Sequence, residues 1–303
     1  MTFTRGRVLS AQSGFYDVET DEGLIAARLR GRLKRGRKSG DIVALGDWVH
    51  LNLEDDQAMI EEVEERERAL IRIAPRPQGV YEQIIVANPD LAFFVFSCAE
   101  PEPKLRMLDR FLVAAEQQSI PAAIVANKVD LVEKKAAEAL FGHYADIGYP
   151  IFYTSVEQNK GLRELKNAMQ DKLSVFAGPS GVGKSSLLNL LQPGLKLRTN
   201  EVSSATEKGR HTTVEKRLFP LSFGGYLADT PGMKAFALRD LEPEEVDGYF
   251  PEIGALVADC EFRDCSHRGE PGCAVIAAVK AGSVHPDRYD SYLRLREGAQ
   301  IEF

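Results

Sequence analysis

The chain has 303 residues, of which 44% are hydrophobic and 27% charged, and its formal net charge is −7. This length favours two or three domains, and the composition excludes a fibrous or wholly disordered chain. The negative charge argues against a protein that coats nucleic acid by bulk attraction. The first ten residues carry no apolar signal region, and the longest apolar run, residues 91–99, is too short to span a bilayer. We therefore expect a soluble, cytoplasmic protein with no membrane partner.

The first segment, residues 1–74, contains short β-like runs separated by glycine and charged turns. These runs are residues 7–9, 15–19, 24–29, 48–53 and 59–63. Several short strands in so short a segment predict a small all-β barrel. Between the third and fourth runs, residues 28–38 (RLRGRLKRGRK) carry seven positive and no acidic side chains. Such a run is either a solvated loop or, on a barrel, a binding site for an RNA backbone, and both interpretations stay open.

Strands and helices alternate in the second segment, residues 75–240, after an Ala-Pro-Arg-Pro sequence at 74–77 that predicts a linker. We expect strands at 91–97, 122–126, 151–154, 174–177, 217–223 and 226–228, and helices at 106–118, 133–147, 161–172 and 184–191. This alternation is typical of a parallel α/β sheet. The polar stretch 198–216 has no clear periodicity, and a loop of that length is usually functional.

A glycine-rich motif follows the strand expected at 174–177. Residues 178–185 match G-x-x-x-x-G-K-[ST] in full. Backbone N–H groups and the start of a helix can surround phosphate oxygens there, Lys184 can reach the β- and γ-phosphates, and Ser185 can bind Mg²⁺. An ordinary glycine turn is the alternative. The predicted phosphate-binding residues are Gly178, Pro179, Ser180, Gly181, Val182, Gly183, Lys184, Ser185 and Ser186.

An N-K-x-D sequence, Asn127 to Asp130, follows the strand expected at 122–126. The Asp130 carboxylate can accept hydrogen bonds from N1–H and the exocyclic amino group of guanine, and the Lys128 stem can pack along the base. A polar helix cap is the alternative, but a phosphate loop in the same domain favours guanine recognition. Ser155, after the strand at 151–154, is a candidate for a secondary contact to the base or a residue of a simple turn.

Asp229 and Gly232 form a D-x-x-G sequence after the strand expected at 226–228. Asp229 would hold Mg²⁺ directly or through water, and the Gly232 N–H would contact the γ-phosphate. Thr212 and Thr213, in the preceding polar stretch, are candidates for the same Mg²⁺, and the sequence does not decide between them.

The position after D-x-x-G holds Met233, where many GTPases have a water-positioning glutamine. Intrinsic hydrolysis should therefore be slow, and an activating partner should complete the site. His211 is the nearest alternative for orienting water, although it is equally well interpreted as an exposed loop histidine.

The order of these motifs is unusual. The N-K-x-D sequence precedes the phosphate loop, whereas ordinary GTPases begin with the phosphate loop. The central segment is therefore predicted to be a circularly permuted GTPase domain that uses GTP, GDP and Mg²⁺.

The third segment, residues 241–303, is expected to be mainly helical and contains Cys260, Cys265, His267 and Cys273. Three thiolates and one imidazole suit a closed tetrahedral Zn²⁺ site, in which one structural ion stabilises a segment with little apolar core. Incidental buried cysteines are the alternative.

This set of motifs closely resembles the ribosome-small-subunit-dependent GTPase A family (RsgA/YjeQ) over nearly the whole chain. The resemblance implies an N-terminal OB-fold, a permuted GTPase domain and a C-terminal zinc-binding domain. It also implies late maturation of the bacterial 30S subunit, rRNA contacts and GTP hydrolysis stimulated by the subunit. A further expectation is that the chain is monomeric in free solution. A non-catalytic RNA-binding assembly protein that only senses GTP is the alternative, and an ATP-using enzyme is a third.

Overall fold

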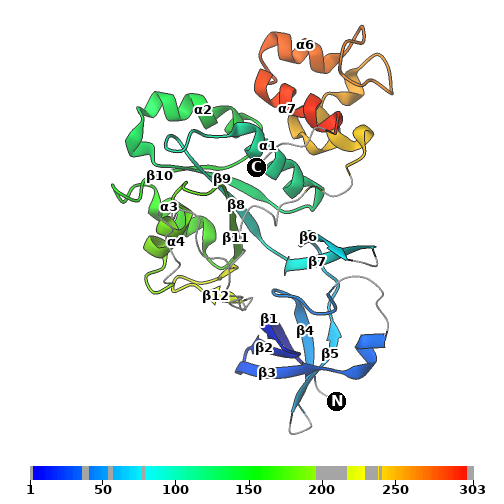
Figure 1. The fold of residues 1–303 in the computed structure, drawn as a ribbon, viewed down its shortest axis with the longest axis vertical. Helices are drawn as coiled ribbons and strands as arrows, with labels where there is room; N and C mark the ends of the chain where they lie inside the picture. The colour runs from blue at the N-terminus through cyan, green and yellow to red at the C-terminus, as the bar shows by residue number, and fades with distance from the viewer. Residues whose placement is uncertain are drawn as a thin grey trace.

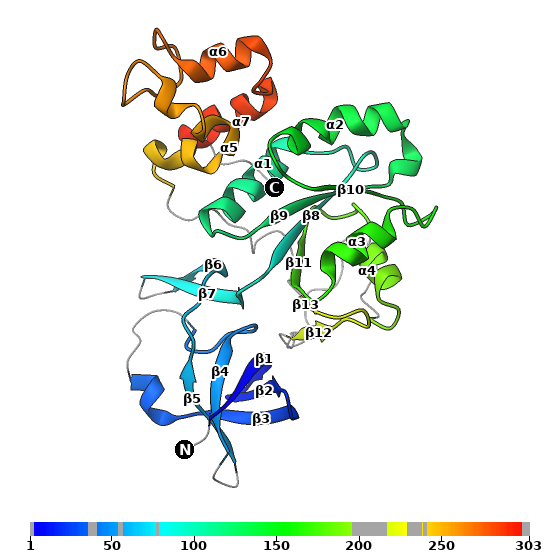
Figure 2. The same cartoon turned by 180° about the vertical axis from the view of Figure 1, so that it is seen from behind.

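The computed structural model describes residues 3–35, 41–53, 57–76, 79–195, 217–228, 238 and 241–298. An N-terminal barrel, a short hairpin, a sheet flanked by helices and a C-terminal helical unit follow one another along the molecule (Figures 1 and 2). Among the helices within these ranges, none combines the length and hydropathy needed to cross a bilayer.

The N-terminal unit is a closed barrel with the strand order β1-β2-β3-β5-β4. Its strands are β1 (Thr4–Gln12), β2 (Phe15–Thr20), β3 (Gly23–Leu29), β4 (Trp48–Asn52) and β5 (Ala58–Val63), with a short 3-10 helix η1 (Gly31–Arg35) after β3. Val18, Val49 and Ile60 lie fully buried in its interior, because alternate residues of each strand point inward. The predicted small barrel of OB-like form is confirmed.

A two-stranded hairpin connects the barrel to the central sheet. Its strands, β6 (Ala69–Arg76) and β7 (Gly79–Ala87), pair antiparallel. The linker predicted at 74–77 is therefore wrong for residues 74–76, which end β6, while Pro77 lies outside the described residues. Both strands of a two-stranded sheet are edges, where a proline that lacks an N–H is tolerated. The hairpin also spans the boundary expected between residues 74 and 75.

The central sheet has the strand order β10-β9-β8-β11-β13-β12, and all neighbouring pairs are parallel except β12 with β13. Its strands are β8 (Leu91–Ser97), β9 (Ala122–Asn127), β10 (Ile151–Thr154), β11 (Leu173–Ala177), β12 (Leu218–Pro220) and β13 (Tyr226–Ala228). The flanking helices are α1 (Leu105–Gln117), α2 (Lys134–Asp146), α3 (Leu162–Met169) and α4 (Lys184–Leu191), with a 3-10 turn η2 (Val129–Leu131) after β9.

Helices cover both faces of this sheet, as β8 shows most clearly. Phe94 packs in one cluster with residues of α1 and α2, whereas Phe93 packs in another with residues of α3 and α4. Every residue of β8 is consequently buried, as expected for a central parallel strand. The predicted α/β architecture is confirmed. The helix expected at 161–172 is shorter, because Gly161 has a positive φ angle and Gln170, with a ψ of 131°, already leaves the helical conformation after Met169.

The C-terminal unit is mainly helical, as predicted. It contains η4 (Pro243–Tyr249), α5 (Pro251–Gly254), η5 (Val257–Asp259), α6 (Ala274–Ala281) and α7 (Pro286–Arg296). Helix α7 lies against α1 of the central unit (Figure 1). Arg288 of α7 is 1% exposed and forms ion pairs with Asp109 of α1 at 2.9 Å and Glu252 of α5 at 2.7 Å. Removing one partner of this network would leave an uncompensated buried charge and would destabilise the contact between the two units.

Candidate active site and metal centre

The predicted nucleotide motifs meet at one edge of the central sheet. The chain runs outward from β8 to β9 and β10, then returns to the other side of β8 to form β11. The direction of chain progression therefore reverses between β8 and β11, and crevices at the carboxyl ends of such strands are the usual ligand sites in α/β sheets. Strands β8, β9, β10 and β11 end at this edge with Ser97, Asn127, Thr154 and Ala177.

The phosphate loop joins β11 to α4 as predicted. A Cβ atom at Gly178 would lie 2.2 Å from the Val95 carbonyl oxygen, so only glycine allows this close approach. Gly183 has a φ of +87° and caps α4, and a Cβ there would lie 2.5 Å from Asn127 Nδ2. Lys184 and Ser185 begin α4, where the helix start favours anions. The Ser185 hydroxyl is a hard oxygen ligand of the kind that Mg²⁺ prefers.

Asn127 ties the base motif to the phosphate loop. Its Nδ2 donates to the Val182 carbonyl at 2.8 Å, and its Oδ1 accepts from the Thr154 hydroxyl at 2.9 Å. Asn127 is 1% exposed, so its side-chain amide is buried. The two hydrogen bonds fix the segments that follow β9, β10 and β11 relative to one another. The sequence places Thr154 beside the predicted base contact, but its bond to Asn127 depends on strand order and has no local signal.

Lys128 and Asp130 lie in the turn after β9. Lys128 has a left-handed backbone with φ of +61°, and its Nζ donates to the Glu100 carbonyl. Its side chain passes the phosphate loop, because a Cβ at Gly183 would lie 3.9 Å from Lys128 Cε. The Glu100 carbonyl belongs to a loop that no sequence motif identified.

Ser155 is fully buried in the turn after β10. Its hydroxyl accepts from the Gln158 N–H at 3.1 Å, and its N–H donates to the Lys160 carbonyl at 3.2 Å. The predicted contact between Ser155 and the base stays a prediction. Five further candidates lie outside the described residues: His211, Thr212, Thr213, Asp229 and Gly232. Strand β13 ends at Ala228, at the same edge of the sheet as the phosphate loop.

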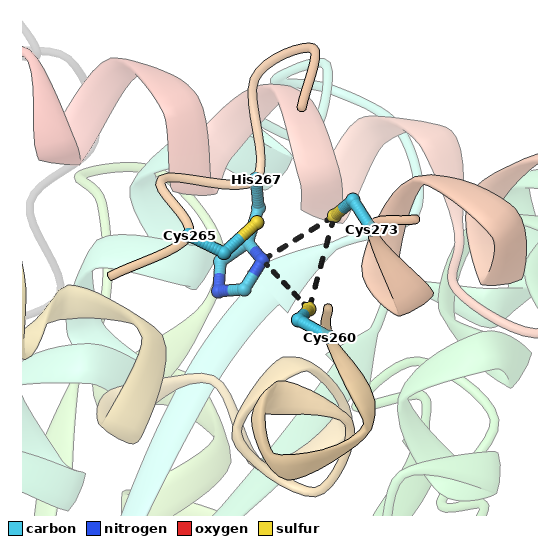
Figure 3. Close-up of side chains that lie close together, drawn as sticks. All are labelled: Cys260, Cys265, His267 and Cys273. Carbon is cyan, nitrogen blue, oxygen red and sulfur yellow. Dashed lines mark hydrogen bonds between the residues drawn. The ribbon is translucent and has the colours of Figure 1, made fainter. Parts of the chain in front are cut away.

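The predicted metal ligands come together in the C-terminal unit (Figure 3). The ligand atoms of Cys260, Cys265, His267 and Cys273 all lie within 4.8 Å of one another. His267 Nδ1 is 3.5 Å from Cys260 Sγ and 3.4 Å from Cys273 Sγ, and these two sulfurs are 4.0 Å apart. Two sulfurs bound tetrahedrally to one Zn²⁺ would be about 3.8 Å apart. The cluster therefore fits Zn²⁺.

Three neighbouring side chains support the ligand loops. His267 Nε2 is buried, has no hydrogen-bond partner within the described ranges, and lies 3.6 Å from Asp247 Oδ2. The Tyr289 hydroxyl donates to the His267 carbonyl at 2.5 Å. The Glu270 carboxylate accepts from the N–H groups of Ser266 and Arg268, both at 2.8 Å. Hydrogen bonding, chiefly from the Ser266 side chain, holds the pKa of Glu270 well below its usual range.

Asp247 is expected to set zinc affinity through His267. A carboxylate facing the nitrogen that does not bind metal fixes the ring orientation and raises its basicity. Asp247→Asn should therefore lower zinc affinity by about tenfold, measured by competition with a chromogenic chelator. Glu244→Gln, on the same 3-10 helix but exposed, is the control and should bind zinc as the wild type does. Equal affinities for the two variants would contradict the assigned role of Asp247.

The arginine side chains of the basic run at 28–38 have different partners in the structure. Arg30 and Arg32 both form ion pairs with Glu61 of β5. Arg28 instead lies over the ring of Phe15, 4.3 Å from its centroid, and Phe15 is 48% exposed. Residues 36–40 lie outside the described part of the chain. Arg28, together with Phe15 of β2, is therefore a candidate for an exposed cationic and aromatic contact.

Comparisons with known proteins agree with this geometry. The family model described as RsgA GTPase matches residues 63–239, and that of the RsgA N-terminal domain matches residues 5–60. A relative from Gemmatimonas aurantiaca, named small ribosomal subunit biogenesis GTPase RsgA, is 44% identical over 98% of this chain and 97% of its own length.

Two solved structures match almost end to end. YjeQ from Thermotoga maritima has a TM-score of 0.81 at 34% identity, covering 100% of both chains. YloQ, described as a circularly permuted GTPase, has a TM-score of 0.78 at 32% identity, covering 100% of this chain and 98% of its own. The matching family models, the end-to-end relatives and the permuted motif order lead to one conclusion: this chain is a circularly permuted GTPase of the RsgA family.

Proposed function

We propose that this chain hydrolyses GTP during late maturation of the bacterial small ribosomal subunit, contacting the rRNA and being stimulated by the subunit. The name of the Gemmatimonas relative supports the subunit as partner. The observation that carries the nucleotide assignment is the hydrogen bond from Asn127 to Val182, which joins the base motif to the phosphate loop. A guanine nucleotide carries both a base and phosphates, so one such molecule can contact the base motif and the phosphate loop together.

The chemistry assigned to the site follows from its charges. Hydrolysis requires water to attack the γ-phosphorus and GDP to leave, so negative charge must be stabilised on the phosphate oxygens. Lys184 and the loop N–H groups would stabilise this charge, and Asp130 would select guanine. Bound Mg²⁺ would neutralise phosphate charge, held by Ser185, Asp229 and either Thr212 or Thr213.

The water-orienting step is assigned to His211, with the Gly232 N–H contacting the γ-phosphate. Because Met233 carries no hydrogen-bonding group suited to this task, we expect slow turnover by the isolated protein. The small subunit would complete the site and raise the rate.

Each of the three predicted segments is proposed to have its own role. Residues 1–74 would bind rRNA, 75–240 would bind and hydrolyse GTP, and 241–303 would be held in shape by one structural Zn²⁺. The protein would act as a monomer in the cytoplasm, where ribosomal subunits are assembled. Because α7 is joined to α1 through Arg288 and Asp109, movements of the central unit would carry the zinc-binding unit with them.

The activity test compares GTP and ATP turnover by the wild-type chain. Hydrolysis of GTP in preference to ATP, over many turnovers, supports the proposal. The alternative, a protein that only senses GTP, predicts binding without turnover even when small subunits are present, and the names of the relatives do not favour it. An ATP-using enzyme predicts the opposite nucleotide preference.

The barrel is expected to contact RNA through Arg28 and Phe15. An exposed aromatic ring can stack on a base, and an arginine beside it adds attraction to phosphate. Among the described residues, no acidic side chain pairs with Arg28 in the way that Glu61 pairs with Arg30. Arg28→Ala and Phe15→Ala should each weaken binding to small-subunit RNA by about tenfold at constant salt.

Arg5→Ala provides the matched control for these two variants. Arg5 also stacks on an aromatic ring of the barrel, at 3.9 Å from the Trp48 centroid, but Glu64 pairs with it at 2.7 Å. RNA affinity should change little in this variant. If Arg28→Ala binds RNA as tightly as Arg5→Ala does, the assignment of Arg28 is wrong.

A further inference from the structure

The loop that follows β8 lies against the nucleotide site, although it contains none of the motifs. It runs from Ser97 at the end of β8 to Lys104, just before α1. The Ser97 side chain is fully buried, and its hydroxyl donates to the Pro101 carbonyl at 2.6 Å. This hydrogen bond closes the loop between the two residues and holds it against the end of β8.

Two contacts connect this loop to the predicted binding residues. The Glu100 carbonyl accepts a hydrogen bond from Lys128 Nζ of the base motif. Pro101 borders the phosphate loop, because a Cβ built on Gly181 would lie 3.6 Å from Pro101 Cδ. The loop therefore reaches the base motif and the phosphate loop at the same time.

We propose that residues 97–101 form a further wall of the guanine-nucleotide site, and that Ser97 is a positioning residue that acts through the Glu100 carbonyl on Lys128. The inference rests on the nucleotide site proposed above. Lys128 serves the base, which GTP and GDP share, so the loop contributes equally to binding both nucleotides and not to the hydrolytic step. An interaction of this kind changes KM and leaves kcat in place.

Ser97→Ala tests the proposal, with Ser174→Ala as its control. Ser174 is also a fully buried serine in a neighbouring strand, but its hydroxyl has no hydrogen-bond partner among the described residues. Ser97→Ala should raise the Kd for GDP bearing a fluorescent N-methylanthraniloyl group, and that for a non-hydrolysable GTP analogue, by about fivefold each. KM for GTP should rise in parallel while kcat stays within about twofold. Ser174→Ala should behave as the wild type.

A double-mutant cycle with Lys128→Met shows whether Ser97 acts through Lys128. In that background Ser97→Ala should have no further effect on Kd, because the contact that it positions is already absent. Additive losses would overturn the proposal, as would equal affinities of Ser97→Ala and Ser174→Ala, or a fall in kcat at unchanged KM. A wild-type chain that does not bind GDP would instead overturn the proposed function itself, so the two failures are distinguishable.

Discussion

Lys184→Ala is expected to lower GTP turnover by about two to three orders of magnitude, with and without small subunits. Lys184 begins α4 directly after the phosphate loop, so its ammonium group is assigned to the β- and γ-phosphates. Charge builds up on these oxygens in the transition state, and no other described residue of the motif carries a positive side chain. The measurement is phosphate release at saturating GTP, followed over many turnovers.

Lys134→Ala is the control for this variant. Lys134 is 83% exposed at the start of α2 and pairs with Glu138, four residues further along the helix. Its replacement should leave the rate unchanged. Substantial turnover by Lys184→Ala would show that hydrolysis does not need the Lys184 ammonium group and would contradict the role assigned to Lys184.

Asp130→Asn is expected to change which base the protein prefers. The carboxylate of Asp130 accepts from two guanine donors, and hydrogen bonds to charged groups are the stronger ones. An amide in its place presents N–H₂ to the guanine N1–H side, so GTP affinity should fall by about a hundredfold. Xanthine has a carbonyl where guanine has its amino group, and the variant should therefore favour xanthosine triphosphate.

Competition of the two triphosphates against labelled GDP measures this preference. Asp146→Asn is the control, since Asp146 is exposed at the end of α2, away from the turn that carries the base motif. An Asp130→Asn protein that keeps the wild-type order of nucleotide affinities would contradict guanine recognition by Asp130 and would favour the ATP-using alternative.

Periodicity predicted most of the central unit because its strands are buried on both faces. Residues 91–97 form a continuous apolar run, and such a run suits a central parallel strand. The glycines of the phosphate loop were also predictable from the sequence motif. At Gly178 the Val95 carbonyl lies so close that there is no room for a side chain. The clustering of Cys260, Cys265, His267 and Cys273 was predictable because all four residues lie within one short stretch of the chain.

Contacts between distant segments were not predictable in this way. The pairing of β6 with β7 brings Pro75 opposite Val80, although proline usually indicates a break. Glu61 neutralises part of the basic run from a strand about thirty residues later, which only the strand order of the barrel reveals. Asp247 precedes the cluster of three cysteines and one histidine in the sequence, and reaches His267 only through the fold of the C-terminal unit.

The most direct test of the account is GTP turnover by the full chain with and without purified small ribosomal subunits. We expect the rate to rise by more than about tenfold with small subunits, because a partner must complete a site that lacks a water-positioning glutamine. Large subunits serve as the control and should leave the rate unchanged. A turnover rate that small subunits do not alter would contradict the proposal that this chain is a GTPase activated by the particle it matures.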